Sequence, residues 1–117
     1  MMKRSLISVL SLLMLVLCIP ALAESTDWNY DANYAILRGY DGAGGDVVVP
    51  AEIDGFTVDV IGINVFKGDT ITSLTLPETV LELRSNAVAS CEKLTSVTLP
   101  QSLVVINRMN FFSCNAL

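Results

Sequence analysis

The chain has 117 residues with seven basic and twelve acidic side chains, a formal net charge of −5, and no histidine. A chain this acidic repels nucleic acid and anionic membrane surfaces, so neither is expected as a partner. The lack of histidine excludes histidine-dependent catalytic triads and imidazole metal sites. The length predicts one small domain.

The chain begins with a segment typical of a secretory signal peptide. A charged start precedes an apolar run over residues 6–19, and an A-x-A sequence ends at Ala23. This pattern predicts residues 1–23 as a signal peptide, with cleavage between Ala23 and Glu24. The run is shorter than the ~20 residues that span a bilayer as a helix, and a retained N-terminal anchor is the alternative. Cleavage leaves five basic and twelve acidic side chains, a charge of −7, and no other segment that could span a membrane.

Residues 24–46 are interpreted as an N-terminal cap segment. Residues 34–40 form an aromatic and β-branched run that suits a strand, and the glycine-rich stretch 41–46 breaks it. A solenoid needs an end that covers the core of its first repeat. We expect four side chains to supply this apolar lid: Trp28, Tyr34, Ile36 and Tyr40.

An apolar phrase repeats in the second half of the chain. The sequence ITSLTLP at residues 71–77 returns 23 positions later as LTSVTLP at residues 94–100, and DVVVP at residues 46–50 is a looser copy. A fixed apolar period of this length predicts a solenoid, in which each unit buries its edge by stacking on the next. We expect leucine-rich repeats over residues 47–117, divided at about 47–70, 71–93 and 94–117.

Each repeat is expected to pair a strand with a second apolar segment and a turn. Alternation sends Leu74, Leu76, Val97 and Leu99 inward, and the following proline ends each strand. The outward positions form the candidate binding face, because solenoid faces commonly bind extended partners. Serine and threonine are also ordinary solvent-facing strand residues, which is the alternative reading. The candidate face comprises Asp46, Val48, Ser73, Thr75, Ser96 and Thr98.

The first repeat is irregular, and the later ones carry a repeated cysteine. Residues 53–56 are expected to be an inserted turn in the first repeat. Cys91 and Cys114 occupy the same slot of consecutive repeats, which favours two stacked, buried thiols. Export also permits a disulfide between them, so both readings stay open.

These phrases carry a family resemblance. Val47–Pro50, Ile61-Gly62, Phe66–Gly68 and Leu94–Pro100 resemble the BspA-like (treponemal-type) leucine-rich repeats, and residues 40–50 look like the lead-in to such repeats. The resemblance covers residues 34–117. It implies a bacterial protein, secreted or attached to the cell surface, that binds proteins of a host or a neighbouring cell. The departures are Arg84 and Asn107 in place of the glycine seen at Gly62, and the pairs Ala87-Val88 and Asn110-Phe111.

No constellation in the sequence supports catalysis. Cys91 and Cys114 lack an activating base, and neither Lys67 nor Lys93 is paired with a serine by any motif. The glycine-rich stretch resembles one calcium-binding repeat, but Asp41 and Asp46 supply too few oxygens for that ion, so no metal or other cofactor is expected.

The sequence therefore predicts a repeat solenoid of the leucine-rich-repeat type. It would consist mainly of short β-strands with tight or short helical turns, in about two and a half 23-residue repeats after the cap. The expected function is non-catalytic protein binding or adhesion, and the alternative is a structural spacer in a larger envelope protein. The chain stops at Leu117, where another strand phrase would begin, which predicts a truncated product or a fragment of a longer protein.

Overall fold

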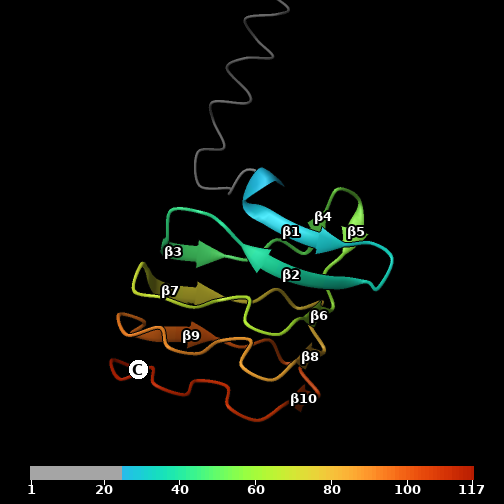
Figure 1. Cartoon of the computed structure of the whole chain (residues 1–117). Helices are drawn as coiled ribbons and strands as arrows, with labels where there is room; N and C mark the ends of the chain where they lie inside the picture. The colour runs from blue at the N-terminus through green and yellow to red at the C-terminus, as the bar shows by residue number, and fades with distance from the viewer. Residues whose placement is uncertain (1–24) are drawn as a thin grey trace, which may run out of the picture.

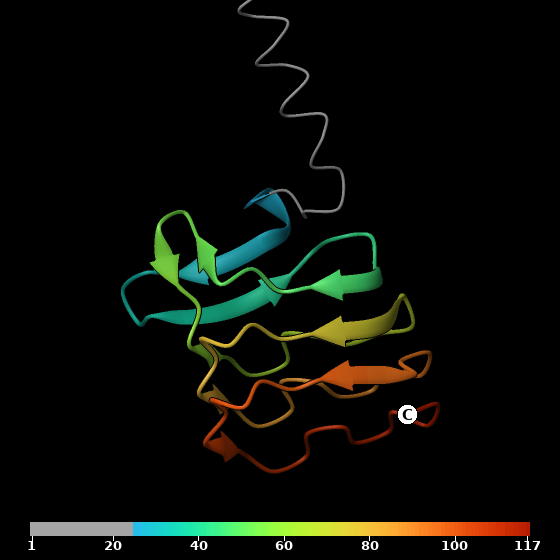
Figure 2. The same cartoon turned by 180° about the vertical axis from the view of Figure 1, so that it is seen from behind.

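The computed structural model describes residues 25–117, which wind into a β-solenoid (Figures 1 and 2). Successive coils stack along one direction, from the β1–β2 hairpin at one end to the C-terminus at the other. The predicted signal peptide (residues 1–23) and its cleavage site at Ala23 and Glu24 lie outside the described residues. The predicted solenoid class is confirmed.

Two parallel sheets run along the stack. One has the order β3-β7-β9, and the other has the order β1-β2-β6-β8-β10, in which only β1 is antiparallel to its neighbour. The elements are η1 (Ser25–Asp27), β1 (Trp28–Asp31), β2 (Ile36–Tyr40), β3 (Gly45–Val48), β4 (Glu52–Ile53), β5 (Phe56–Thr57), β6 (Val60–Ile61), β7 (Ile71–Thr75), β8 (Glu82–Leu83), β9 (Ser96–Thr98) and β10 (Val105–Ile106).

The register between coils reproduces the sequence period. Ser73 pairs with Ser96 and Leu83 with Ile106, each 23 residues apart. Between β3 and β7 the spacing is longer because a small antiparallel hairpin, β4–β5, is inserted there. Its two-residue turn, Asp54-Gly55, has positive φ at both positions (51° and 84°), as a tight hairpin turn of this kind requires.

The turns between the two sheets use left-handed backbone at repeated positions. Asn64, Asn86 and Met109 have φ between 57° and 65°, and Gly68, Ser90 and Ser113 follow them at a second slot with φ of 103°, 55° and 57°. These residues reverse the chain without helix, and no α-helix forms within residues 25–117. Of the two alternatives expected for the turns, tight or short helical, this part of the chain has tight turns. No helix there is long and apolar enough to cross a bilayer.

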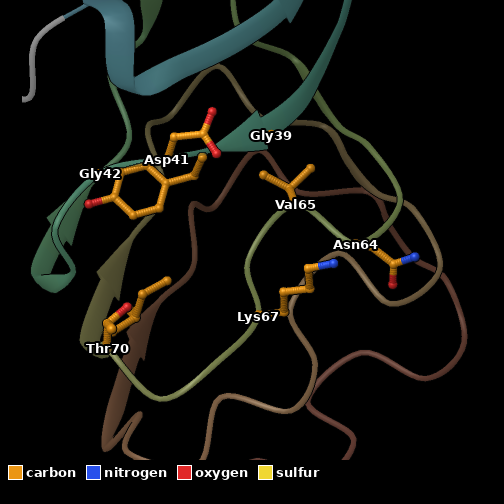
Figure 3. A pocket seen from close by; sticks show the side chains of 9 residues that line it. Gly39, Asp41, Gly42, Asn64, Val65, Lys67 and Thr70 are labelled. Atoms are coloured by element: carbon orange, nitrogen blue, oxygen red, sulfur yellow. The ribbon is translucent and has the colours of Figure 1, made fainter.

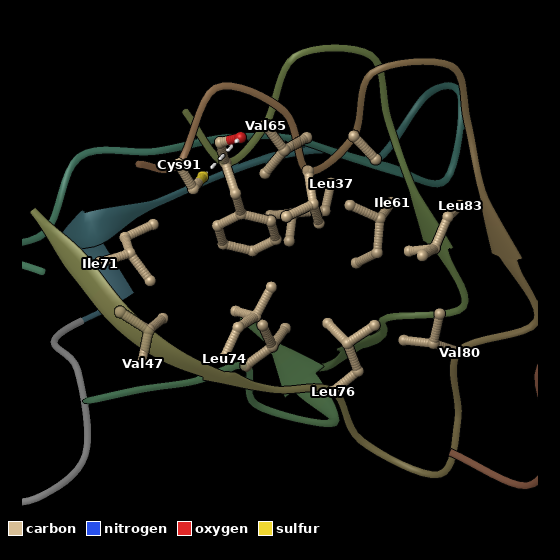
Figure 4. Close-up of a cluster of buried hydrophobic side chains, with 14 of the residues drawn as sticks. Leu37, Val47, Ile61, Val65, Ile71, Leu74, Leu76, Val80, Leu83 and Cys91 are labelled. Atoms are coloured by element: carbon tan, nitrogen blue, oxygen red, sulfur yellow. Dashed lines mark hydrogen bonds between the residues drawn. The ribbon is translucent and has the colours of Figure 1, made fainter. Parts of the chain in front are cut away.

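The core lies between the two sheets and is apolar throughout. Figure 4 shows side chains of both sheets pointing toward one another, with Leu74 and Leu76 from one side and Ile61 and Leu83 from the other. Burial of about 25 cal/mol per Å² of apolar surface is the main force that holds such short strands together. No polar or charged residue of the described chain is buried in this core.

Two side chains expected in the core are exposed. Leu76 is 3% exposed as predicted, but Leu99, at the same position one coil later, is 41% exposed because no coil of this structure packs over it. Tyr34 lies at the β1–β2 turn and is 68% exposed, so it does not form part of the apolar lid. Trp28 and Ile36 are buried, and Tyr40 packs against the core.

Candidate functional site

The outer face of the β3-β7-β9 sheet collects the six candidate binding residues in two columns. Asp46 pairs with Ser73 and Ser73 with Ser96, while Val48 pairs with Thr75 and Thr75 with Thr98. Because side chains alternate along a strand, the residues between them face the core instead. We call this surface the hydroxyl face: Asp46, Val48, Ser73, Thr75, Ser96 and Thr98.

The hydroxyl face offers polar side chains on a backbone fixed by the sheet. The Ser73 Oγ donates a hydrogen bond to Asp46 Oδ1 at 2.7 Å, which joins the first two rungs through their side chains. Asp46, Ser96 and Thr98 are exposed, and Ser73 and Thr75 are half-buried between their neighbours. A surface of this kind presents hydroxyl donors and acceptors at the regular ~4.8 Å spacing of adjacent strands.

A further threonine contact, between Thr95 and Thr72, fixes one edge of this face. The backbone N–H and the Oγ1 of Thr95 both donate to the carbonyl oxygen of Thr72, at 2.9 and 3.1 Å. This side-chain bond repeats the ladder bond between β7 and β9 at the point where both strands begin. The hydroxyl face is therefore held at its start as well as along its length.

A hollow of about 250 Å³ opens beside the start of β7. Figure 3 shows Asp41 on the loop after β2, with Asn64, Lys67 and Thr70 on the turn that leads into β7. The Thr70 carbonyl accepts a hydrogen bond from Gly45 N at 2.7 Å, which ties this hollow to the first residue of β3. The hollow therefore lies at the end of the sheet where β3 and β7 begin, and one cationic and one acidic side chain, Lys67 and Asp41, line it.

The sequence did not indicate this hollow. Asn64 and Lys67 lie in a turn whose apolar neighbours, Val65 and Phe66, carry the repeat signal. The only sequence feature that marks this turn is Asn64. Asparagine recurs at the same repeat position as Asn86, and it tolerates left-handed backbone.

The two aspartates considered for calcium serve different features. Asp41 lines the hollow, whereas the Asp46 carboxylate is bonded to Ser73 on the hydroxyl face. Within residues 25–117 no three carboxylates or thiols gather into a group that could hold a metal ion. Lys67 lines the hollow without a serine among the lining residues.

The two cysteines are buried, free thiols in adjacent coils. The Cys91 Sγ donates weakly to the carbonyl oxygens of Phe66 at 3.5 Å and of Ala89 at 3.6 Å. Burial raises the pKa of the Cys91 thiol to about 11, and the neighbouring Cys114 adds to this effect. Since the thiolate is the reactive form, Cys91 acts as a core side chain in this structure. Cys114 is buried against the same core.

The parallel stack, its 23-residue rungs and its exposed strand face define a solenoid of the leucine-rich-repeat class. Residues 53–117 match the family described as BspA type leucine rich repeat region (6 copies). The chain belongs to the BspA-type leucine-rich repeat family.

A solved structure supports the same assignment. The chain is similar to the leucine rich repeat protein of T. pallidum (TpLRR), with 27% sequence identity and a TM-score of 0.73 over 81% of this chain. The match covers 47% of that protein, so the chain spans about half its length. No curated protein matches the chain.

Proposed function

We propose that this protein is secreted or displayed on a bacterial cell surface and binds a protein partner through the hydroxyl face, without catalysis. The observation that carries the proposal is the alignment of six outward side chains in two columns on one parallel sheet. Leucine-rich repeat proteins commonly bind proteins, which supports the same conclusion. The partner class we favour is a surface protein of a host or neighbouring cell.

The chemistry of the face favours an extended, polar partner. Hydroxyl groups donate and accept hydrogen bonds, and Val48, which is 52% exposed, adds apolar contact beside them. Basic side chains are absent from these six positions, so the recognition we propose depends on hydrogen bonds and shape. The hollow at Asp41 and Lys67 extends the available surface toward the ~800 Å² per partner of a standard interface.

The test replaces hydroxyls of two adjacent rungs with lysine. The double variant T75K/T98K places two long cationic side chains in one column of the face, where they block contact with a partner. Binding is measured on an array of host and bacterial surface proteins. We expect at least one saturable interaction of the unaltered protein, which the double variant loses.

The matched control is L81K/V104K, which adds the same charge at two exposed positions of adjacent coils outside the hydroxyl face (46% and 77% exposed). Equal loss of binding in both double variants would mean that charge, and not the face, controls binding. No saturable binding by the unaltered protein would contradict the proposal and favour the structural-spacer alternative.

A further inference from the structure

Three successive rungs of the other sheet align two arginines around a glycine. Leu37 pairs with Ile61, and Ile61 pairs with Leu83. The next residue of each rung is therefore Arg38, Gly62 and Arg84, in line across the sheet. At the ~4.8 Å spacing of strands, the two arginine Cα atoms lie about 10 Å apart, with no side chain between them.

A hollow occupies the space over the glycine. It has a volume of about 150 Å³ and is lined by Ile36, Arg38, Gly62, Ile63 and Arg84. One water molecule takes up about 30 Å³ in the liquid, so the space exceeds what a single water needs.

The glycine is required by close contact and not by its backbone angles. Gly62 is absent from the positive-φ positions of the chain, and a Cβ there would lie 2.7 Å from the Leu37 carbonyl oxygen and 2.8 Å from Ile36 Cγ2. Both neighbouring rungs carry arginine at this slot. The place of a Gly62 Cβ is therefore already filled by β2, and Gly62 lines the hollow between the two arginines with its backbone alone.

Both guanidinium groups have a carboxylate on one side, at hydrogen-bond distance for Arg38 and at a longer distance for Arg84. Arg38 Nε donates to Asp31 Oδ2 at 2.7 Å, and the guanidinium carbon lies 5.3 Å from the centre of the Tyr34 ring. Arg84 Nε lies 3.7 Å from Glu82 Oε1, an oxygen that also accepts a hydrogen bond from the Asn107 side chain at 3.0 Å.

These contacts orient the arginines and leave some of their hydrogen-bond donors available. Among the described residues, each pairing is made through Nε, so the terminal Nη groups can donate to an incoming ligand. The side chains of Arg38 and Arg84 are 50% and 43% exposed, so a solute can reach them. The described chain has only five basic residues, and two of them line this one hollow.

We propose that Arg38 and Arg84 form a binding site for an oxyanion, a carboxylate, sulfate or phosphate group, received over Gly62. The planar guanidinium fork matches two oxygens of such a group and donates two parallel, charge-assisted hydrogen bonds. The anion would offset two positive charges that the adjacent Asp31 and Glu82 neutralise only from their Nε sides. This site lies on the opposite sheet from the hydroxyl face and does not depend on it.

The experiment is an NMR titration of the purified protein with sodium sulfate, against sodium chloride at the same ionic strength. The Nε–Hε signals of the arginines report the site directly. We expect saturable shifts of the Arg38 and Arg84 signals with sulfate alone. R38Q and R84Q should each weaken sulfate binding about tenfold or more, since each removes one charged fork.

Two further variants separate the site from general charge. R108Q makes the same charge change at an exposed arginine outside the hollow and should leave sulfate binding unchanged. R84K keeps the charge but loses the fork, and should bind more weakly than the unaltered protein. Backbone amide spectra show that each variant is folded.

The outcomes distinguish the site from adventitious attraction and identify the source of the anion. No saturable shift with sulfate, or equal weakening by R108Q and R84Q, would overturn the proposal. A second titration uses an acetylated glutamate tripeptide amide. Tighter binding of this peptide than of sulfate supports the site with an acidic protein side chain as ligand. Tighter binding of sulfate supports it with a free or sugar-borne anion as ligand.

Discussion

The two ends of the coil stack carry similar apolar surfaces, but only one of them is covered. At the first coil, the β1–β2 hairpin places Trp28 against Tyr40 and Phe66, with ring centres 4.7 and 6.2 Å away, and Trp28 is 6% exposed. At the last coil, Leu99 and Ile106 are 41% and 48% exposed, although the residues one coil earlier are buried.

The difference shows that a side chain of a repeat is buried only when another coil packs over it, whatever the sequence pattern of its own repeat. Leu76 and Leu99 are the same residue in the same slot, and only Leu76 has a coil on both sides. The stability of a solenoid is close to a sum of single-repeat terms and interfaces between neighbours. Substitutions at matched slots of the inner and last coils therefore measure what a neighbouring coil contributes.

The largest effect is expected at the covered end. Trp28→Ala removes the ring that joins the hairpin to Phe66, and we expect the free energy of unfolding to fall by about 3–5 kcal/mol. The measurement is urea denaturation followed by circular dichroism. The control is Tyr34→Ala, an exposed aromatic of the same hairpin whose ring contacts Arg38, for which we expect a loss of no more than about 1 kcal/mol. Similar losses in both variants would show that the hairpin is not anchored by Trp28.

The next comparison uses identical residues in adjacent coils. Leu76→Ala leaves a cavity in the core and should cost about 2–5 kcal/mol, whereas Leu99→Ala should cost about 1 kcal/mol or less because its side chain is already exposed. Both values come from the same denaturation experiment. If the two variants lost equal stability, Leu99 would be covered in solution, and the contrast between the two coils would fail.

A third prediction concerns pH and the buried thiol. The pKa of Cys91 is raised by burial to about 11 from an ordinary value of 9.0, so the folded state keeps a proton that the unfolded state loses in this range. The stabilisation is thus complete below pH 9 and is lost as the pH rises toward about 11. We expect the unfolding free energy to fall by about 1–3 kcal/mol more in the unaltered protein than in Cys91→Ala over this interval.

The comparison with Cys91→Ala removes the contribution of other groups. Tyr30 also has a raised pKa, caused by burial and by the nearby Asp59, and it titrates in both proteins. Parallel pH profiles would contradict a buried, protonated Cys91.

Mass measurement under non-reducing conditions should also find both thiols free, since the structure holds them unbridged.

The sequence was sufficient for the strands and the direction of their side chains. Alternation along ITSLTLP placed Leu74 and Leu76 in the core and Ser73 and Thr75 outside. Successive side chains of a strand point to opposite faces, so the apolar residues alone decide which face is buried. The turns were less predictable. Left-handed backbone at Met109 and Ser113 leaves little mark in the sequence, since neither residue favours that conformation as glycine does.

The hollow lined by Arg38, Gly62 and Arg84 could not be inferred from the repeats. Arg38 belongs to β2, which precedes the repeated phrases and shares no sequence period with Gly62 and Arg84. Only the pairing of β2 with β6 brings these three residues into line. Asn110, one of the departures from the family pattern, is also explained only by the structure. Its side chain accepts a hydrogen bond from Val88 N at 3.0 Å and donates to the Arg84 and Asn107 carbonyls at 2.9 Å each.

The smallest effect tests the turns of the inner and last coils. Ser90 and Ser113 both hold left-handed backbone at the slot that glycine fills in Gly68. A left-handed conformation costs an ordinary residue about 1–2 kcal/mol, and glycine loses about 0.5–1 kcal/mol more entropy on folding. Ser90→Gly should therefore stabilise the protein by about 0.5 kcal/mol, as measured by urea denaturation.

The matched change in the last coil sharpens the contrast between coils. Ser113→Gly relieves the same strain, but this coil packs against a neighbour on one side only. If the last coil opens before the rest of the stack, the strain at Ser113 is released before the main unfolding transition. Ser113→Gly should then leave the urea midpoint of that transition unchanged. Equal stabilisation by the two variants would mean that the last coil unfolds together with the inner ones. The exposed Leu99 and Ile106 would then lie on a coil that is as firmly bound as those it copies.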